Sequence, residues 1–376
     1  MRMRSSVSSL LSLILLLGSL AESASAKVLE GTVEGKAPLK RIDVIEFAPE
    51  NVLLIGDGTG SQIIAVQTND KASAAALPAK IENLNEKLAA KVGAKAEGIE
   101  LLDMAVNPNS GRVYFALRKQ DDKSYLILTL SAGGEIGLLD LDHVTYSRVM
   151  LPKKESAISR VTDVTWVDGR LVAAATANEE FASKIFVATA PLKHEASGEL
   201  HSAETYHVSH RKWETRAPMT VILPYRENGK SYVVGAFACT PVVKYPLDDL
   251  LPDAKVKGSS MIELGSGNRP LDMFLYEKDG KEYVLSNTFR FHHERKPFGP
   301  SPYWTVKFES GLLAESENIN EKAINRLKGD ADATPRIQLV ESFHGVMQMD
   351  RLGANQVVVL RTVDGKRVDF EVLPLP

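Results

Sequence analysis

The chain has 376 residues, with 45 Lys and Arg against 48 Asp and Glu, a formal net charge of −3. Hydrophobic residues make up 44% and charged residues 25%, which excludes an extended disordered chain, a collagen-like repeat and a polytopic membrane protein. The nearly balanced charge gives no support for nucleic-acid binding through bulk electrostatics. A globular protein remains.

Residues 1–26 have the layout of a secretory signal peptide. Arg2 and Arg4 precede an apolar run at 10–20, and the small residues 24–26 stand before Lys27. The run is shorter than the roughly 20 residues that span a bilayer. We therefore expect cleavage after Ala26, no transmembrane segment in the mature chain, and a periplasmic or secreted protein. A retained N-terminal anchor is the alternative.

A β-rich unit recurs along residues 27–376. Each copy has two strands joined by a turn rich in Asn, Asp and Gly, which adopt the positive φ of tight hairpins. The hairpins are expected at 42–55, 102–116, 162–174, 219–234, 271–285 and 346–360. A third apolar strand follows each, at 63–66, 125–128, 184–187, 242–245, 304–307 and 368–372. A fourth, outer strand is plausible in most units, for example at 204–207 and 336–340.

Antiparallel four-stranded units at near-constant spacing are typical of a β-propeller. Equivalent positions lie 54 to 73 residues apart, at Asp43, Asp103, Asp163, Pro218, Asp272 and Gly345. We predict one all-β domain, a six-bladed β-propeller, in which 28–33 closes the ring by pairing with the last unit. A seven-bladed ring, a β-sandwich and an irregular all-β protein are the alternatives. Apolar residues at helical spacing predict small helical loop insertions at 79–92 and, more weakly, at 312–327.

Four aspartates are expected at one rim of the central channel. They are Asp43, Asp103, Asp163 and Asp272, with Arg216, Arg269 and His344 beside them. Because carboxylates in a low-dielectric channel need compensation, the ring indicates a cation site or a seat for a polar ligand. The alternative is that each Asp caps the backbone of the neighbouring blade.

Loops after the second strands are expected on the same face. The residues proposed to bind a ligand there or at the rim are Arg118, Glu179, Cys239, Arg269, Asp272, Asn287 and Arg290. A divalent metal could be held by Asp103, Asp163, Asp272, His292 and His344, although their spacing matches no zinc or copper motif. Solvated loop histidines are the alternative. Cys239, the single cysteine, is either buried and inert or functional.

Catalytic signatures are missing from the sequence. The Gly-rich stretch 56–60 has no parallel βαβ unit around it, and there is no Gly-x-Ser-x-Gly, His-Glu-x-x-His or Cys-x-x-Cys-His motif. No catalytic residue can be nominated.

Two segments, 237–246 (FACTPVVKYP) and 268–273 (NRPLDM), resemble parts of exported bacterial β-propeller proteins without an assigned activity. The layout is also distantly similar to quinoprotein-type and to NHL- or YVTN-type propellers. The resemblance implies the fold and supplies no catalytic residues.

Two main hypotheses on function follow. The first is an exported scaffold that binds a small ligand or a protein partner at the channel mouth. The second is a periplasmic enzyme, either a metal- or quinone-dependent oxidoreductase or a lactonase-like hydrolase with a cation in the channel. An accessory subunit of an electron-transfer complex is a third hypothesis.

Overall fold

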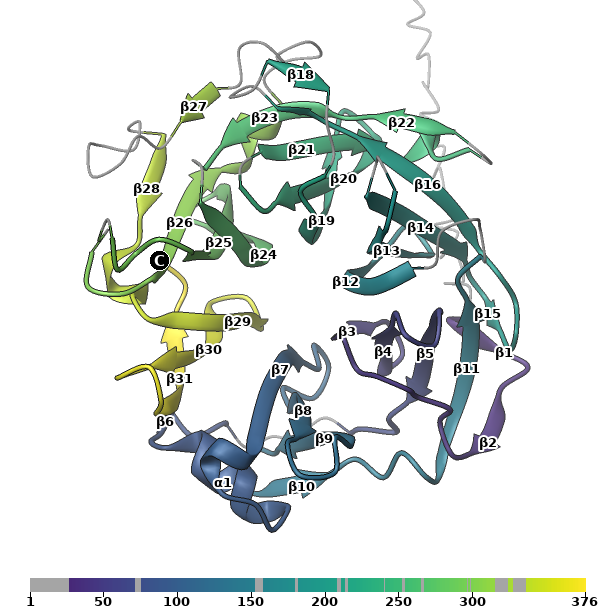
Figure 1. Cartoon of the computed structure of the whole chain (residues 1–376), viewed down its shortest axis with the longest axis vertical. Helices are drawn as coiled ribbons and strands as arrows, with labels where there is room; N and C mark the ends of the chain where they lie inside the picture. Colours follow the sequence, from purple (N-terminus) through teal and green to yellow (C-terminus); the bar gives the residue numbers. More distant parts are fainter. Residues whose placement is uncertain are drawn as a thin grey trace, which may run out of the picture.

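The computed structural model is a ring of six antiparallel sheets around a central channel, a six-bladed β-propeller (Figure 1). It describes residues 27–376 apart from 72–75, 153–157, 180–181, 208–210, 214–215, 240, 252–253, 265–266, 296, 298, 315–323 and 327–335. The predicted signal peptide lies outside the described residues. No helix in the described part is long and apolar enough to cross a membrane.

We name the blades A to F in the order in which the chain forms their innermost strands. Strands are given from the channel outwards. Blade A contains β3 (Val44–Ala48), β4 (Val52–Asp57), β5 (Gln62–Gln67), β11 (Val144–Met150) and β2 (Val33–Gly35). Blade B contains β7 (Ile99–Val106), β8 (Val113–Lys119), β9 (Tyr125–Leu130) and β10 (Ile136–Leu138). Blade C contains β12 (Ile158–Val167), β13 (Arg170–Ala177), β14 (Ser183–Thr189), β16 (Glu199–Glu204) and β22 (Lys255–Lys257).

The other three blades come from the C-terminal half and one earlier strand. Blade D contains β19 (Met219–Glu227), β20 (Lys230–Phe237), β21 (Pro241–Pro246), β23 (Ser259–Glu263) and β27 (Ile324–Arg326). Blade E contains β24 (Asn268–Lys278), β25 (Lys281–Arg290), β26 (Tyr303–Glu309) and β28 (Ile337–Leu339). Blade F contains β29 (Val346–Leu352), β30 (Gln356–Thr362), β31 (Val368–Pro374) and β6 (Lys80–Ile81).

A few small elements connect the blades. They are the helix α1 (Leu84–Lys91), the pair β1 (Leu29–Glu30) and β15 (Leu192–Lys193), the hairpin β17 (Tyr206–His207) and β18 (Lys212–Trp213), and the 3-10 turns Ala96–Gly98, Leu247–Asp249, Ser310–Leu313 and Glu341–Phe343.

The blades do not follow one another around the ring in chain order. The innermost strand of blade A contacts those of blades B and C, and the innermost strand of blade B contacts that of blade F. The ring therefore runs B, A, C, D, E, F and back to B (Figure 1). Blade A is inserted between blades B and C, although its three inner strands precede both in the sequence.

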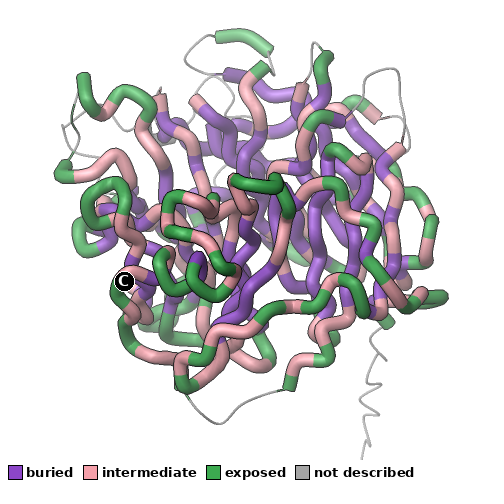
Figure 2. Tube along the Cα trace, turned by 60° about the horizontal axis from the view of Figure 1, so that its bottom comes forward, coloured by how far each residue is buried: buried purple, intermediate pink, exposed green. Residues whose placement is uncertain are grey.

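Six apolar clusters fill the spaces between neighbouring blades. They lie between A and C, A and B, C and D, D and E, E and F, and B and F. In β4, for example, Leu54 faces blade C, whereas Leu53 and Ile55 face blade B. Because side chains alternate along a strand and both faces are covered, the inner strands read as unbroken apolar runs. Buried segments accordingly fill the interior of the ring (Figure 2).

Most of the predicted strands are confirmed, and the ring has six blades. The described parts of the long interval between Asp272 and Gly345 contain strands of blade E and the outer strand β27 of blade D, and no seventh blade. The prediction of a helix at 79–92 is right only for Leu84–Lys91: Lys80–Ile81 is a strand, and Asn83, with φ of 54°, separates the two. The weaker helix at 312–327 is wrong at Ile324–Arg326, which is a strand of blade D, whereas Leu312 and Leu313 lie in the short 3-10 helix Ser310–Leu313.

The predicted closure of the ring by 28–33 is also wrong. Blade F is closed by β6, whose Lys80 and Ile81 pair with Glu371 and Phe370. The N-terminal segment instead extends blade A, where β2 pairs with β11, while β1 pairs with β15. The physical reason is the ring order: blade F borders blades B and E, so the N-terminal segment beside blades A and C does not reach it.

Candidate functional site

The innermost strands of blades B to F share an irregularity where they enter the channel. A register shift occurs between Leu101 and Asp103 in blade B and between Val161 and Asp163 in blade C. Similar shifts occur in blades D, E and F, after Met219, Pro270 and Val346. A bulge sets two residues against one on the partner strand and re-aims the side chains beside it. Consecutive residues such as Thr162 and Asp163 therefore both line the channel.

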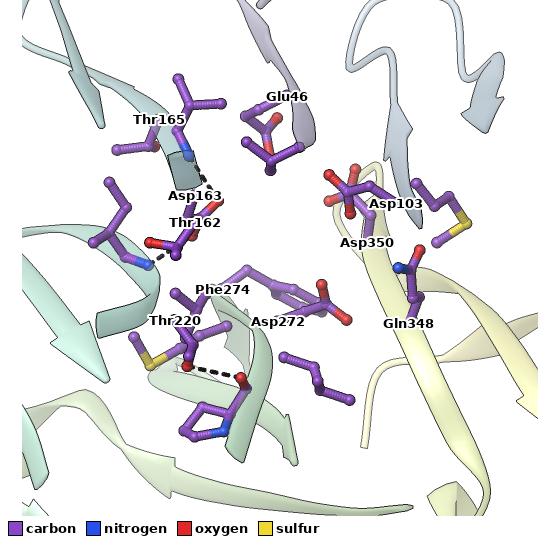
Figure 3. Close-up of a pocket in the computed structure, with 18 of the residues that line it drawn as sticks. Glu46, Asp103, Thr162, Asp163, Thr165, Thr220, Asp272, Phe274, Gln348 and Asp350 are labelled. Carbon is purple, nitrogen blue, oxygen red and sulfur yellow. Dashed lines mark hydrogen bonds between the residues drawn. The ribbon is translucent and has the colours of Figure 1, made fainter. Parts of the chain in front are cut away.

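These strands enclose a channel with a volume of about 410 Å³. Its wall is polar, and six acidic residues contribute to it: Asp43, Glu46, Asp103, Asp163, Asp272 and Asp350. Three arginines, Arg160, Arg269 and Arg351, also line it. Figure 3 shows the labelled side chains of Glu46, Asp103, Asp163, Asp272 and Asp350 around the opening of the channel.

The aspartates fasten each blade to the next. Oδ2 of Asp103 in blade B accepts a hydrogen bond from the backbone N–H of Ile45 in blade A at 2.7 Å. Oδ2 of Asp163 in blade C does the same for Ile222 in blade D at 2.6 Å. The remaining contacts of this kind are Asp43 to Val161 (3.1 Å), Asp272 to Met349 (3.0 Å) and Asp350 to Val106 (2.6 Å). The structure thus contains the capping that the alternative interpretation predicted, in which an Asp caps the backbone of the neighbouring blade.

Hydroxyl and amide groups bridge blades in the same way. Thr220 of blade D, where the aspartate is missing, donates to the carbonyl of Pro270 in blade E at 2.8 Å (Figure 3). Thr162 donates to Met219 at 2.6 Å, and Gln348 donates to Leu102 at 3.1 Å. All six junctions are therefore bridged from one blade to the next, in the order B, A, C, D, E, F.

Five of the acidic side chains form a cluster of interacting charges, which we call the carboxyl cluster: Glu46, Asp103, Asp163, Asp272 and Asp350. Burial raises the pKa of Asp103 to about 7, and the charge of Asp350 contributes. Burial raises the pKa of Asp163 to about 8, with contributions from Asp103 and Asp350.

Burial raises the pKa values of the other three members as well. Burial raises the pKa of Asp350 to about 6. It also raises the pKa of Glu46 and of Asp272 well above the usual range, and the charges of Asp103 and Asp163 add to both shifts. None of the five has a described Lys, Arg or His within ion-pair distance. Burial and mutual repulsion thus raise the pKa values of the cluster, while the charge of Arg160 opposes the rise at Asp103 and that of Arg351 opposes it at Asp350.

Asp43 differs because arginine compensates it. Its Oδ1 lies 2.6 Å from Nε of Arg41 and 3.8 Å from Nε of Arg160, and its Oδ2 also accepts from Gly58 N–H. Burial raises its pKa, while the hydrogen bonds and the two arginines counteract the rise. Asp43 is thus bound into the junction between blades A and C.

The structure divides the predicted site residues into two groups. Asp103, Asp163, Arg269 and Asp272 line the channel, as does Asp43. Asn287 lies behind it as a structural bridge: its Oδ1 accepts from the N–H of Asp272, and its Nδ2 donates to Val346. Arg118, Glu179, Cys239, Arg290, His292 and His344 do not line the channel, nor does Arg216.

Several of the residues outside the channel have local partners. Arg118 lies near Glu100 and over the ring of Tyr125. Glu179 forms an ion pair with Lys184 at 2.5 Å. Cys239 is half-buried in a tight turn with φ of 66°, and its N–H donates to Asn268. These loop residues therefore lie outside the channel. Three of them lie near one another at the start of β24, because Arg290 pairs with Asn268, the Asn268 carbonyl accepts from Cys239, and His292 lies beside Gly267.

The predicted metal set is separated in space as well. Asp103, Asp163 and Asp272 lie in the channel, whereas His292 and His344 lie outside it. Among the described residues, no group of three or more His, Cys, Asp and Glu side chains has an arrangement that could hold a metal ion. The five residues predicted to hold a metal are thus divided between the channel and the loops outside it.

Sequence reasoning missed Glu46, Asp350, Arg160 and Gln348. Each is a polar residue inside a strand that is otherwise mostly apolar, and this interruption is the signal that could have found them. A comparison restricted to one equivalent position per repeat overlooks them, because they lie three to five residues from it.

The chain has distant structural neighbours but matches no known protein family. No protein-family model and no curated protein matches the chain. Among solved structures, it is similar to a PQQ-bound aldose sugar dehydrogenase from Streptomyces coelicolor, with 13% identity, 93% of this chain and 98% of that chain covered, and a TM-score of 0.34. It is also similar to Drosophila semaphorin 1b (10% identity; 93% and 88% covered; TM-score 0.39).

A third similar structure is an endo-arabinase from Bacteroides thetaiotaomicron (12% identity; 81% and 96% covered; TM-score 0.35). Identities and TM-scores this low carry no inference about activity. The chain has the β-propeller fold.

Proposed function

We propose that this protein is an exported ligand-binding β-propeller whose channel holds a small organic cation. The observation that carries the proposal is the carboxyl cluster. Five acidic side chains from five blades line one volume, and at least three of them raise the pKa of their neighbours. An ammonium group placed among them would relieve this repulsion and lower their pKa values.

The size of the channel favours an organic ligand. A volume of about 410 Å³ lies within the range of roughly 300–1,000 Å³ for small-molecule sites. The carboxyl oxygens are already oriented by backbone N–H groups, as in Asp163, whose two oxygens accept from Val164 and Ile222. Such fixed acceptors favour a ligand with several N–H donors.

The enzymatic alternatives receive less support. A metal-dependent oxidoreductase or a lactonase-like hydrolase needs a ligand set for its cation, and the described residues assemble none. A quinone-dependent enzyme or an electron-transfer subunit has no observation in its favour. Export and a periplasmic or secreted location rest on the signal-peptide pattern of residues 1–26.

The experiment is calorimetric titration of the mature protein with 1,4-diaminobutane between pH 6 and 8.5. The cluster ionises over this range while the diamine stays charged, so the affinity should rise with pH and binding should release protons. The release is measured by comparing buffers with different ionisation enthalpies. Asp163→Asn should weaken binding about tenfold at pH 8.5, since it removes one charge. The exposed control Asp121→Asn should not. Absence of binding by the wild type throughout this range would refute the proposal.

A further inference from the structure

The channel also holds two arginines in matching positions. Arg160 begins the pattern Arg-Val-Thr-Asp that ends at Asp163, and Arg269 begins Arg-Pro-Leu-Asp, which ends at Asp272. In both cases a bulge separates the arginine from the aspartate, and both residues line the channel. Blades C and E thus each present a guanidinium and a carboxyl group along the same strand.

Neither arginine is fully paired within the described part of the chain. The side chain of Arg160 is 39% exposed, and its ion pair with Asp43 is long, at 3.8 Å. Arg269 is half-buried and has no ion pair with a described residue. Burial lowers its pKa, and the positive charge of Arg160 lowers it further. Nε of Arg160 is buried without a hydrogen-bond partner in the described part of the chain. Its nearest carboxyl oxygen, Oδ1 of Asp43 at 3.8 Å, is already held by Arg41 at 2.6 Å.

Two like charges that interact in a half-buried wall favour an anion between them. Guanidinium groups bind carboxylates with paired N–H donors in a fixed plane. Leaving such donors unpaired costs free energy, which a bound anion would recover. A carboxylate on the ligand is the simplest group that satisfies both arginines.

We propose that Arg160 and Arg269 form an anion subsite at one end of the channel, so that the ligand is a zwitterion with a carboxylate on the arginines and an ammonium group on the carboxyl cluster. This inference rests on the proposed function, which supplies the ammonium end. Three residues of bulged strand separate each arginine from its aspartate, or about 7–10 Å along the strand. An ω-amino acid with several methylene groups between its charges matches this separation.

The experiment compares three probes of equal chain length: 6-aminohexanoate, hexylamine and hexanoate, titrated into the mature protein at pH 8. The zwitterion should bind at least tenfold more tightly than either single-charge probe. Arg269→Gln should abolish this preference by weakening 6-aminohexanoate and tightening hexylamine, since a repelling charge is removed. Arg216→Gln is the matched control: Arg216 lies three residues before Met219 in blade D, yet it is exposed and outside the channel.

The possible outcomes separate the two proposals. Hexylamine binding as tightly as 6-aminohexanoate would overturn the anion subsite and leave the cation site standing. Hexanoate as the tightest probe would overturn the cation site, and with it the zwitterion. Should Arg269→Gln fail to fold, the wild-type ranking of the three probes decides the question alone, and equal weakness of all three overturns both proposals.

Discussion

Asp103 accepts a hydrogen bond from the backbone N–H of Ile45, 58 residues earlier in the chain, at 2.7 Å. The next aspartate of the repeat, Asp163, instead caps Ile222, 59 residues later. The reversal arises because blade A is inserted between blades B and C. Around the ring, each blade caps the next one in the same direction. The partner of each aspartate is therefore set by the position of its blade in the ring and not by the order of the blades in the sequence.

Loss of this cap should destabilise the ring. Asp103→Ala leaves the N–H of Ile45 without its acceptor, and we expect a loss of about 1–3 kcal/mol in the free energy of unfolding. Asp103→Asn, which keeps an acceptor oxygen, should lose less. Urea denaturation of both variants measures the effect, with the exposed Asp121→Ala as control. Equal stability of Asp103→Ala and wild type would show that the hydrogen bond between Ile45 and Asp103 does not stabilise the fold.

Stability should fall as the pH rises from about 5 to 8. The folded-state pKa values of Asp350, Asp103 and Asp163, about 6, 7 and 8, lie above the usual value near 3.9 of an unfolded chain. The folded protein therefore binds more protons than the unfolded protein in this range, and the stability they confer is lost as they ionise. At about 1.4 kcal/mol per pKa unit, the three groups together correspond to a decrease of roughly 8 kcal/mol in the free energy of unfolding, measured by urea denaturation at several pH values.

The same experiment identifies the groups responsible. Asp163→Asn removes the group with the highest of these three pKa values and should flatten the decrease between pH 6.5 and 8. A saturating concentration of 1,4-diaminobutane should flatten it as well if the cation occupies the cluster. A rise in stability with pH over this interval would contradict the assignment of the raised pKa values.

Gly56 should be intolerant of a side chain. A Cβ at this position would lie 2.8 Å from Cγ1 of both Val44 and Val161, at the contact between blades A and C. Gly56→Ala should therefore push the blades apart and cost about 1–3 kcal/mol, as overpacking does. Gly311→Ala, where a Cβ would meet nothing within 4 Å, is the control. A neutral Gly56→Ala would argue against the direct contact of blades A and C.

A cut in the backbone between blade A and the rest should leave the protein intact. The fragment 27–71 carries β3, β4 and β5, while β11 belongs to the larger fragment. Pairing of β5 with β11 over six residue pairs, together with the apolar clusters on both sides of blade A, should hold the fragments together. A protease site introduced at 72–75 and size-exclusion chromatography test this. Separate elution of the smaller fragment would show that blade A is not integrated as described.

Local sequence predicts the strands well for a physical reason. Each blade is covered on both faces, so its inner strands must be apolar throughout, as Val52, Leu53, Leu54 and Ile55 illustrate. Turns between them require Asn, Asp or Gly, for instance Asn228 with φ of 49° and Gly229 with φ of 75°. Both signals lie within about fifteen residues of sequence and need no knowledge of the ring.

The ring order could not be predicted in this way. The repeats resemble one another, and nothing within Val144–Met150 indicates that it belongs to blade A and not to blade B. The choice depends on long-range pairing, such as Tyr146 with Val66. For the site, the position within a repeat correctly predicted the level of Asp103 and Asp163 along the channel axis. It did not give the distance from the axis, and Cys239 and His344 lie outside the channel that these aspartates line.

Blades A and F are each completed by a strand from a distant part of the sequence. This restricts how the protein can fold during synthesis. The strand β5 has a free edge until residues 144–150 have been made, and β6 finds no partner until β31 near the C-terminus is complete. A free strand edge is a template for association with other chains. While the chain is synthesised from its N-terminus, these strand edges therefore stay open to other chains until their partner strands have emerged.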